Sequence, residues 1–266
     1  MSHFFVFFQG SESIDWPAEI GICERSADRY SSNYHAWSHR QWVLQNAPFL
    51  LKSELMLSDK FMRKHISDYS SYHYRQKLIA KAYEMCYYDA MEMKRLIWLK
   101  QLINYYLIAD VGSVAEILDV MLPGLANVKE VGEQRLHSFL FCCNLAAHDM
   151  RLCNDQKSMY GERECFELHR RASLKFIVEQ CVRLLLGEMS GRYVPPMTTM
   201  QAKRFNEQLC KYNYAANPFL RALKHSESLL GESHRRWCSL YLGFSYGDDE
   251  DEDEDMSSEN VVKLLQ

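Results

Sequence analysis

Apolar residues recur at helical spacing along most of the chain. The clearest long pattern covers residues 89–106, where Met93, Leu96, Ile97 and Ile103 fall largely on one face of a helix. Alternation of apolar and polar residues with a period of two, which indicates half-buried strands, is never sustained. Glycine and proline are scarce, at 11 and 6 residues, which is too few for a turn-rich sandwich or barrel. The pattern therefore predicts an all-α fold.

Further helices are predicted between local start and stop signals. Ser113 is a suitable N-cap, and Pro123 with Gly124 ends the short helix that follows it. Residues 191–199, which include Pro195 and Pro196, are the best candidate for an internal loop. Two more helices are predicted over residues 130–149 and 162–186, and residues 200–214 and 218–244 close the folded part.

One segment of the chain has a near copy 35 residues later. Residues 33–41 read NYHAWSHRQ and residues 68–76 read DYSSYHYRQ, and the two align without a gap. Two fainter copies follow, LHRR at 168–171 and SHRRW at 233–237. Repeats of this length are typical of helical solenoids, but the tetratricopeptide type requires a Gly that neither copy has. The matched pairs of the first two copies are Asn33 with Asp68, Tyr34 with Tyr69, Trp37 with Tyr72, Arg40 with Arg75 and Gln41 with Gln76.

The matched residues suggest that the repeating unit is a helical hairpin. Asn33 and Asp68 are both favourable N-caps, so each copy can begin a helix at the same point. Arg40 lies one turn beyond Trp37 on the same helix face and should be largely buried. A buried guanidinium needs hydrogen-bond partners, most simply the free carbonyls at a neighbouring helix end. The residues that we expect to lock one hairpin onto the next are Trp37, Arg40, Tyr72 and Arg75.

The charge of the chain is unevenly distributed. Its 266 residues fit one large domain or two modest ones, and residues 248–255 read DDEDEDED. Removing these eight charges from the formal net charge of −4 leaves +4, well below the excess expected of a nucleic-acid binder. Since the acidic run repels itself, we expect a solvated tail, with docking to a basic partner as the alternative. The expected division is a divergent segment 1–20, a helical-repeat domain 21–246 and an acidic disordered tail 247–266.

The cysteines point to a reducing compartment. Their number, nine, is odd, and no two of them form a CxxC pair. The apolar residues 4–8 are too few for a signal-peptide core, and no run of about 18 apolar residues is long enough to span a membrane. We therefore expect a cytoplasmic protein whose cysteines are mostly small core residues. Cys142, Cys143 and His148 match no standard zinc spacing, so no metal and no cofactor are expected in this chain.

Residues 33–45, NYHAWSHRQWVLQ, resemble the repeat of protein prenyltransferase alpha subunits, whose core pattern is Asn-Tyr-x-x-Trp-x-x-Arg. Residues 68–76 are similar to a degenerate repeat of the same family, and the pair most resembles the branch of repeat-containing proteins. The resemblance implies a right-handed α-α hairpin solenoid that wraps around a separate beta subunit. That subunit would be an α-α barrel that carries the zinc and most of the isoprenoid pocket.

The same resemblance implies a function and a site. The heterodimer would transfer an isoprenoid from its diphosphate to a cysteine near the C-terminus of a protein substrate. The branch implied here would pair with the beta subunit of Rab geranylgeranyltransferase, so the isoprenoid expected is geranylgeranyl. In such subunits the Asn-Tyr-His triplet faces the departing diphosphate, which implies catalytic roles for His35 and Tyr34 and a diphosphate-adjacent place for Asn33. The alternatives are that His35 is an exposed residue without a functional role and that Asn33 serves only as an N-cap.

A second function stays open beside the first. The first repeats of the family have no counterpart in residues 1–20, and the region 81–160 is longer than the repeat spacing requires. The missing first repeats favour a non-enzymatic helical-repeat scaffold that binds other proteins, whereas the Asn-Tyr-His triplet favours the transferase subunit. A single-chain enzyme is disfavoured, because the sequence has no Gly-rich phosphate loop, nucleophile elbow or zinc motif.

Overall fold

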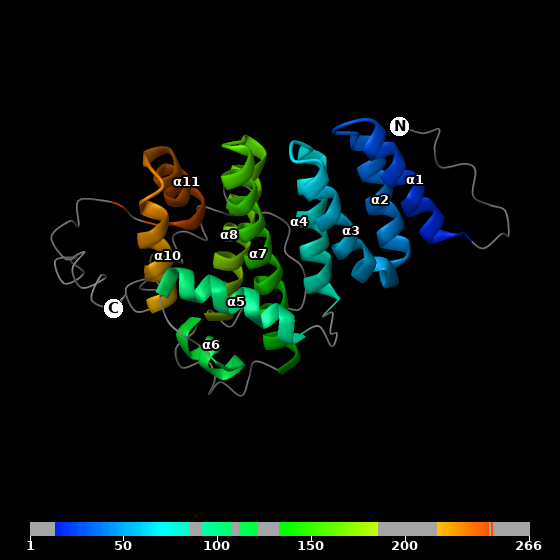
Figure 1. Cartoon of the computed structure of the whole chain (residues 1–266). Helices are drawn as coiled ribbons and strands as arrows, with labels where there is room; N and C mark the ends of the chain where they lie inside the picture. Colours follow the sequence, from blue (N-terminus) through cyan, green and yellow to red (C-terminus); the bar gives the residue numbers. More distant parts are fainter. Residues whose placement is uncertain are drawn as a thin grey trace. The chain divides into compact units, whose positions relative to one another are not determined.

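The described part of the protein is built from helices. The structure is a computed structural model that describes residues 14–85, 92–107, 112–121, 133–185, 217–244 and 246, and no strand occurs among them. The predicted all-α fold is confirmed. In chain order the elements are α1 (Trp16–Arg29), α2 (Tyr34–Asn46), the 3₁₀ turn η1 (Pro48–Leu50), α3 (Leu51–Lys64), α4 (Tyr69–Glu84), α5 (Glu92–Leu107), α6 (Val114–Met121), α7 (Glu133–Tyr160), α8 (Glu164–Leu185), α10 (Pro218–Ser228) and α11 (Glu232–Leu242) (Figure 1).

The chain divides into two compact units, residues 1–78 and 79–266. In the first unit α1 packs against α2, and the two lie side by side in Figure 1. The predicted N-caps are confirmed, since Asn33 Oδ1 accepts the Ala36 N–H at 3.2 Å and Asp68 Oδ1 accepts the Ser71 N–H at 3.1 Å. Asp68 Oδ2 also accepts the N–H of Ser32 at 3.1 Å. The starts of the two matched helices, α2 and α4, are therefore tied together directly.

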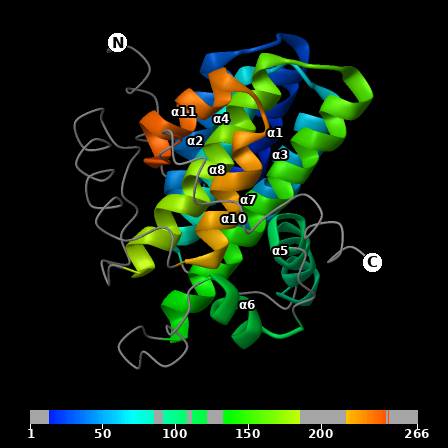
Figure 2. The same cartoon turned by 90° about the vertical axis from the view of Figure 1, so that its left-hand side faces the viewer.

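In the second unit α7 and α8 form a long hairpin. They lie side by side in Figures 1 and 2, with α5 packed on α7, α10 on α5 and α11 on α8. The helix predicted over residues 130–149 in fact runs to Tyr160, because the next glycine is Gly161, whose φ of 77° ends it. Segment 218–244 holds two helices, since Gly231 with a φ of 95° separates α10 from α11.

Of the remaining predictions for local structure, some fall on residues that the structure describes and others do not. Ser113 caps α6 as predicted, with its Oγ accepting the Glu116 N–H at 3.2 Å. The loop 191–199, the segment 200–214 and the acidic tail 247–266 lie outside the described residues. Along the described residues, no helix combines the length and the apolar character needed to cross a membrane.

Candidate functional site at the start of α2

The Asn-Tyr-His triplet occupies the first turn of α2. Tyr34 is 69% exposed and His35 is exposed as well. Their rings meet edge to face, with 6.0 Å between the centroids and 72° between the planes. The first N–H groups of a helix lack partners within the helix, and together with the helix dipole they favour an anion. The phenol, the imidazole and the helix start are therefore all presented to solvent on one short stretch of chain.

Asn33 is held more firmly than its two neighbours. Its Oδ1 caps α2, and its Nδ2 donates to the carbonyl oxygen of Ser26 in the last turn of α1 at 3.4 Å. Both ends of the amide are thus engaged within the first unit. The arrangement agrees with the alternative of a plain N-cap, and a place beside a diphosphate stays a prediction for this residue.

Trp37 forms the packed base beneath the triplet. It is 4% exposed, and its ring meets Phe61 edge to face at 4.9 Å and lies 5.2 Å from Tyr74. Tyr34 and Trp37 are three positions apart. One turn of helix therefore carries the exposed Tyr34 and the buried Trp37, which anchors it. This burial agrees with the packing role expected of Trp37.

Arg40 is buried beside Trp37, but its predicted partner was wrong. Its guanidinium is 1% exposed and forms a bidentate pair with Glu54 of α3, with Nε–Oε2 at 2.6 Å and Nη2–Oε1 at 3.0 Å. It also lies over the rings of Trp37 at 5.4 Å and Tyr74 at 5.6 Å. Burial opposes its charge, yet the hydrogen bonds and charge of Glu54 outweigh burial and raise the pKa of Arg40. A full carboxylate neutralises a buried cation, which helix-end carbonyls do only in part.

The second copy of the repeat places its residues in the same unit. Tyr72 is 3% exposed and Arg75 is 2% exposed. Arg75 Nη1 donates to the Leu55 carbonyl at 2.5 Å and to Ser58 Oγ at 3.1 Å. This arginine does bind a carbonyl, although one inside α3 rather than at a helix end. The burial of both residues agrees with their expected structural role.

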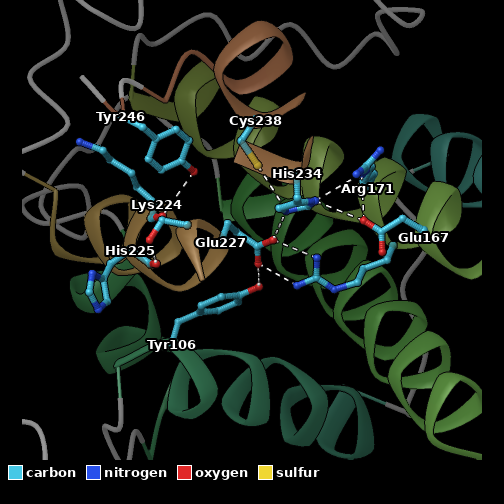
Figure 3. A network of polar contacts seen from close by, with 11 residues as sticks. Tyr106, Glu167, Arg171, Lys224, His225, Glu227, His234, Cys238 and Tyr246 are labelled. Atoms are coloured by element: carbon cyan, nitrogen blue, oxygen red, sulfur yellow. Dashed lines mark hydrogen bonds and ion pairs between the residues drawn. The ribbon is translucent and has the colours of Figure 1, made fainter. Parts of the chain in front are cut away.

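The second unit contains an arrangement like that of Arg40. The carboxylate of Glu227, which is fully buried, forms a bidentate pair with Arg170 at 2.8 and 2.9 Å and accepts the Tyr106 hydroxyl at 2.6 Å (Figure 3). In the first unit Glu54 likewise accepts the Tyr74 hydroxyl, at 2.5 Å. Each unit thus buries an Arg–Glu–Tyr cluster. The faint copy at 168–171 supplies the arginine of this second cluster.

His234 adds a further group to the second cluster. Its Nε2 lies 2.7 Å from Glu227 Oε2, and its Nδ1 lies 3.2 Å from Glu167 Oε1. Burial lowers the pKa of His234, but hydrogen bonds to Cys238 and the two carboxylates outweigh it and raise the pKa to about 10. Burial likewise opposes ionisation of Glu227, yet its hydrogen bonds lower the pKa of that carboxyl to about 2. In the faint copy at 233–237 the arginine that aligns with Arg40 is Arg235, which is exposed, whereas the preceding His234 is buried.

Among the described residues, one group of three metal-binding side chains comes together, made of Glu227, His234 and Cys238 with donor atoms within 4.8 Å of one another. The sequence had drawn attention instead to residues on α7, where the Cys142 thiol faces the carbonyl oxygen of Ile79 at 3.8 Å and burial raises the pKa of Cys143. The usable sequence signal was the His-x-x-x-Cys spacing on α11, which puts both side chains on one helix face.

The comparison with protein families bears on the first unit. The model described as the protein prenyltransferase alpha subunit repeat matches residues 16–47 and 51–82. The chain carries prenyltransferase alpha-subunit repeats. Each match begins near the start of one hairpin, α1–α2 or α3–α4, and the two starts are 35 residues apart, as predicted. The first repeat takes in residues 16–20, which the sequence pattern alone does not assign to a repeat.

Curated relatives match the same region. The chain is 46% identical over 65 residues to protein prenyltransferase alpha subunit repeat-containing protein 1 of Danio rerio, which covers 23% of this chain and 15% of the relative. The human protein of that name is 40% identical over 81 residues, covering 29% and 20%. Geranylgeranyl transferase type-2 subunit alpha of Rattus norvegicus is 32% identical over 65 residues, covering 24% and 12%. These matches span a fifth or less of each relative's length, and no solved structure matches the chain.

Proposed function

We propose that the chain is the alpha-subunit component of a cytoplasmic protein prenyltransferase heterodimer. Its partner is a prenyltransferase beta subunit of the Rab geranylgeranyltransferase type, which supplies the zinc that activates the acceptor thiol. The heterodimer transfers geranylgeranyl from its diphosphate to a C-terminal cysteine of a protein substrate. The two repeats and the similarity to a geranylgeranyl transferase type-2 alpha subunit support this proposal.

The observation that carries the proposal is the exposed pair Tyr34 and His35 on a rigid base. A departing diphosphate is stabilised by hydrogen-bond donors held in place before the reaction. The phenol and the imidazole lie in the first turn of α2. The buried Trp37 and the buried Arg40–Glu54 pair hold that helix against its neighbours. In this role His35 and Tyr34 donate to the diphosphate oxygens, and Asn33 keeps the helix start in place.

Co-expression with candidate beta subunits tests the proposal. We expect a 1:1 complex with the Rab-type beta subunit in size-exclusion chromatography, and transfer of labelled geranylgeranyl to a protein with a C-terminal cysteine. His35→Ala and Tyr34→Phe should preserve the complex and slow the transfer. Ser38→Ala, in the following turn of the same helix and not part of the triplet, serves as the matched control. If the chain forms no complex with any beta subunit tested, the proposal is overturned.

A non-enzymatic scaffold is the second candidate. It is favoured by the exposed apolar side chains of the first unit, because apolar surface of this kind commonly marks protein-binding sites. The scaffold predicts stable binding of a protein partner without any prenyl transfer, whichever beta subunit is added. The exposed side chains are Ile22, Tyr30, Tyr34, Phe49, Met56 and Tyr69, which are 44–69% exposed.

A further inference from the structure

The C-terminal hairpin gathers three donor atoms of different kinds. Glu227 lies at the end of α10, and His234 and Cys238 lie one turn apart on α11 (Figure 3). His234 Nε2 is 2.7 Å from Glu227 Oε2 and 3.4 Å from Cys238 Sγ. All three side chains are at most 3% exposed. A thiol, an imidazole and a carboxylate therefore converge in a site that solvent scarcely reaches.

We propose that Glu227, His234 and Cys238 bind a structural zinc ion that joins α10 to α11. Sulfur, nitrogen and oxygen donors of these types are the usual protein ligands of zinc, and water can supply a fourth. A tetrahedral ion with bond lengths of about 2.0–2.3 Å places its ligand atoms roughly 3.3–3.8 Å apart. The 3.4 Å between His234 Nε2 and Cys238 Sγ lies within this range, whereas the 2.7 Å between His234 Nε2 and Glu227 Oε2 is shorter, so binding requires the Glu227 carboxylate to rotate away from the imidazole. The site departs from the expectation that this chain holds no metal, and it is independent of the proposed catalytic zinc on a beta subunit.

The surroundings of the three donors are those of a supported metal site. A zinc-bound histidine usually gives its second ring N–H to a carboxylate, which fixes the orientation of the ring. His234 Nδ1 faces Glu167 of α8 at 3.2 Å, and Arg171 holds that carboxylate at 2.9 Å. Glu227 is positioned in turn by Arg170 and by the Tyr106 hydroxyl. The imidazole and the carboxylate thus each have a partner that orients them.

Charged groups surround the three donors in equal numbers of either sign. The carboxylates of Glu227 and Glu167 pair with the guanidinium groups of Arg170 and Arg171 at 2.8 and 2.9 Å. Because zinc replaces protons on its ligands, binding brings less positive charge beside these guanidinium groups than the ion alone carries.

Cobalt serves as the spectroscopic probe for this site. The full chain is stripped with a chelator, reduced, and titrated with Co²⁺ under nitrogen. We expect one equivalent to produce a thiolate-to-cobalt charge-transfer band and intense tetrahedral ligand-field bands, and one equivalent of Zn²⁺ to abolish both. Cys238→Ser should lose the charge-transfer band. Cys23→Ser, which removes an equally buried thiol in the other unit, should retain it.

X-ray absorption on the zinc-loaded chain keeps the test independent of variants that fail to fold. One sulfur neighbour together with nitrogen and oxygen neighbours supports the proposal. Two or more sulfur neighbours would assign the metal to other cysteines and overturn it. A chain that is helical by circular dichroism yet binds no cobalt, or a cobalt spectrum unchanged in Cys238→Ser, would also overturn it. The cluster would then be an ion-pair network only.

Discussion

The Arg40–Glu54 pair of the first unit should tolerate joint replacement better than the loss of either member. Both side chains are about 1% exposed, and the pair is bidentate. Glu54→Leu leaves a buried guanidinium without its counter-ion, and Arg40→Met leaves a carboxylate whose remaining donor is Tyr74. Breaking a buried pair in this way costs about 3–5 kcal/mol. Each single change should therefore raise the local opening equilibrium by roughly two to four orders of magnitude.

The double change Arg40→Met with Glu54→Leu removes both charges at once. The main destabilisation that remains comes from the Tyr74 hydroxyl, which loses its acceptor. This loss should lower the free energy of unfolding by about 1–3 kcal/mol. Adding Tyr74→Phe removes that group too, so the triple variant should approach the original stability. Hydrogen exchange of peptides from α2 and α3 measures the opening locally, which suits a chain of two compact units. If the losses of stability of the two single variants add, so that the double variant is less stable than either of them, this account of the pair is refuted.

Three further predictions concern α2 and the Tyr74 hydroxyl of α4. Trp37→Ala should cost about 3–5 kcal/mol by leaving a cavity beside Phe61 and Tyr74, whereas His35→Ala should leave the thermal midpoint unchanged and slow prenyl transfer roughly five- to 150-fold. Unchanged turnover in His35→Ala would reduce it to a surface histidine. Asn33→Ala should cost about 1 kcal/mol through loss of the N-cap, and Asn33→Gly only a few tenths. Equal denaturation curves for these two variants would contradict the capping role. Tyr74→Phe alone should cost about 1.5–3 kcal/mol, because it removes a hydrogen bond to a buried carboxylate, and a smaller shift in urea denaturation would count against that bond.

The sequence predicted local features well because they depend on few neighbouring residues. An N-cap such as Asn33 acts on an N–H three positions ahead, so its effect can be recognised within one turn. The burial of Trp37 and Arg40 followed from helical spacing in the same way. The end of α7 was misplaced because residues 150–160 contain no strong stop signal before Gly161. In that region only the position of the glycine decides how long the helix runs.

The partners of the buried arginines were missed because they come from distant parts of the chain. Glu54 follows Arg40 by 14 residues, whereas Glu227 follows Arg170 by 57. A signal for the first existed, since Glu54 stands between the apolar positions Leu51 and Leu55 on the buried face of α3. A carboxylate at such a position must be paired or neutral, because an isolated buried charge is too costly.

The two Arg–Glu–Tyr clusters also differ in their order along the chain, which explains why alignment relates them so weakly. In the first unit the order is Arg40, Glu54, Tyr74, all within 35 residues. In the second unit the tyrosine comes first, from α5, followed by the arginine of α8 and the glutamate of α10. A gapless comparison can match LHRR at 168–171 to the first repeat. It cannot match the glutamate and the tyrosine, because their order along the chain differs between the two units. The chemical requirement is the same in both units, since a buried guanidinium needs a carboxylate and that carboxylate needs a further donor for its remaining lone pairs. A structural search for buried Arg–Glu–Tyr clusters would therefore relate the two units, whereas a sequence search for residues at fixed spacing does not.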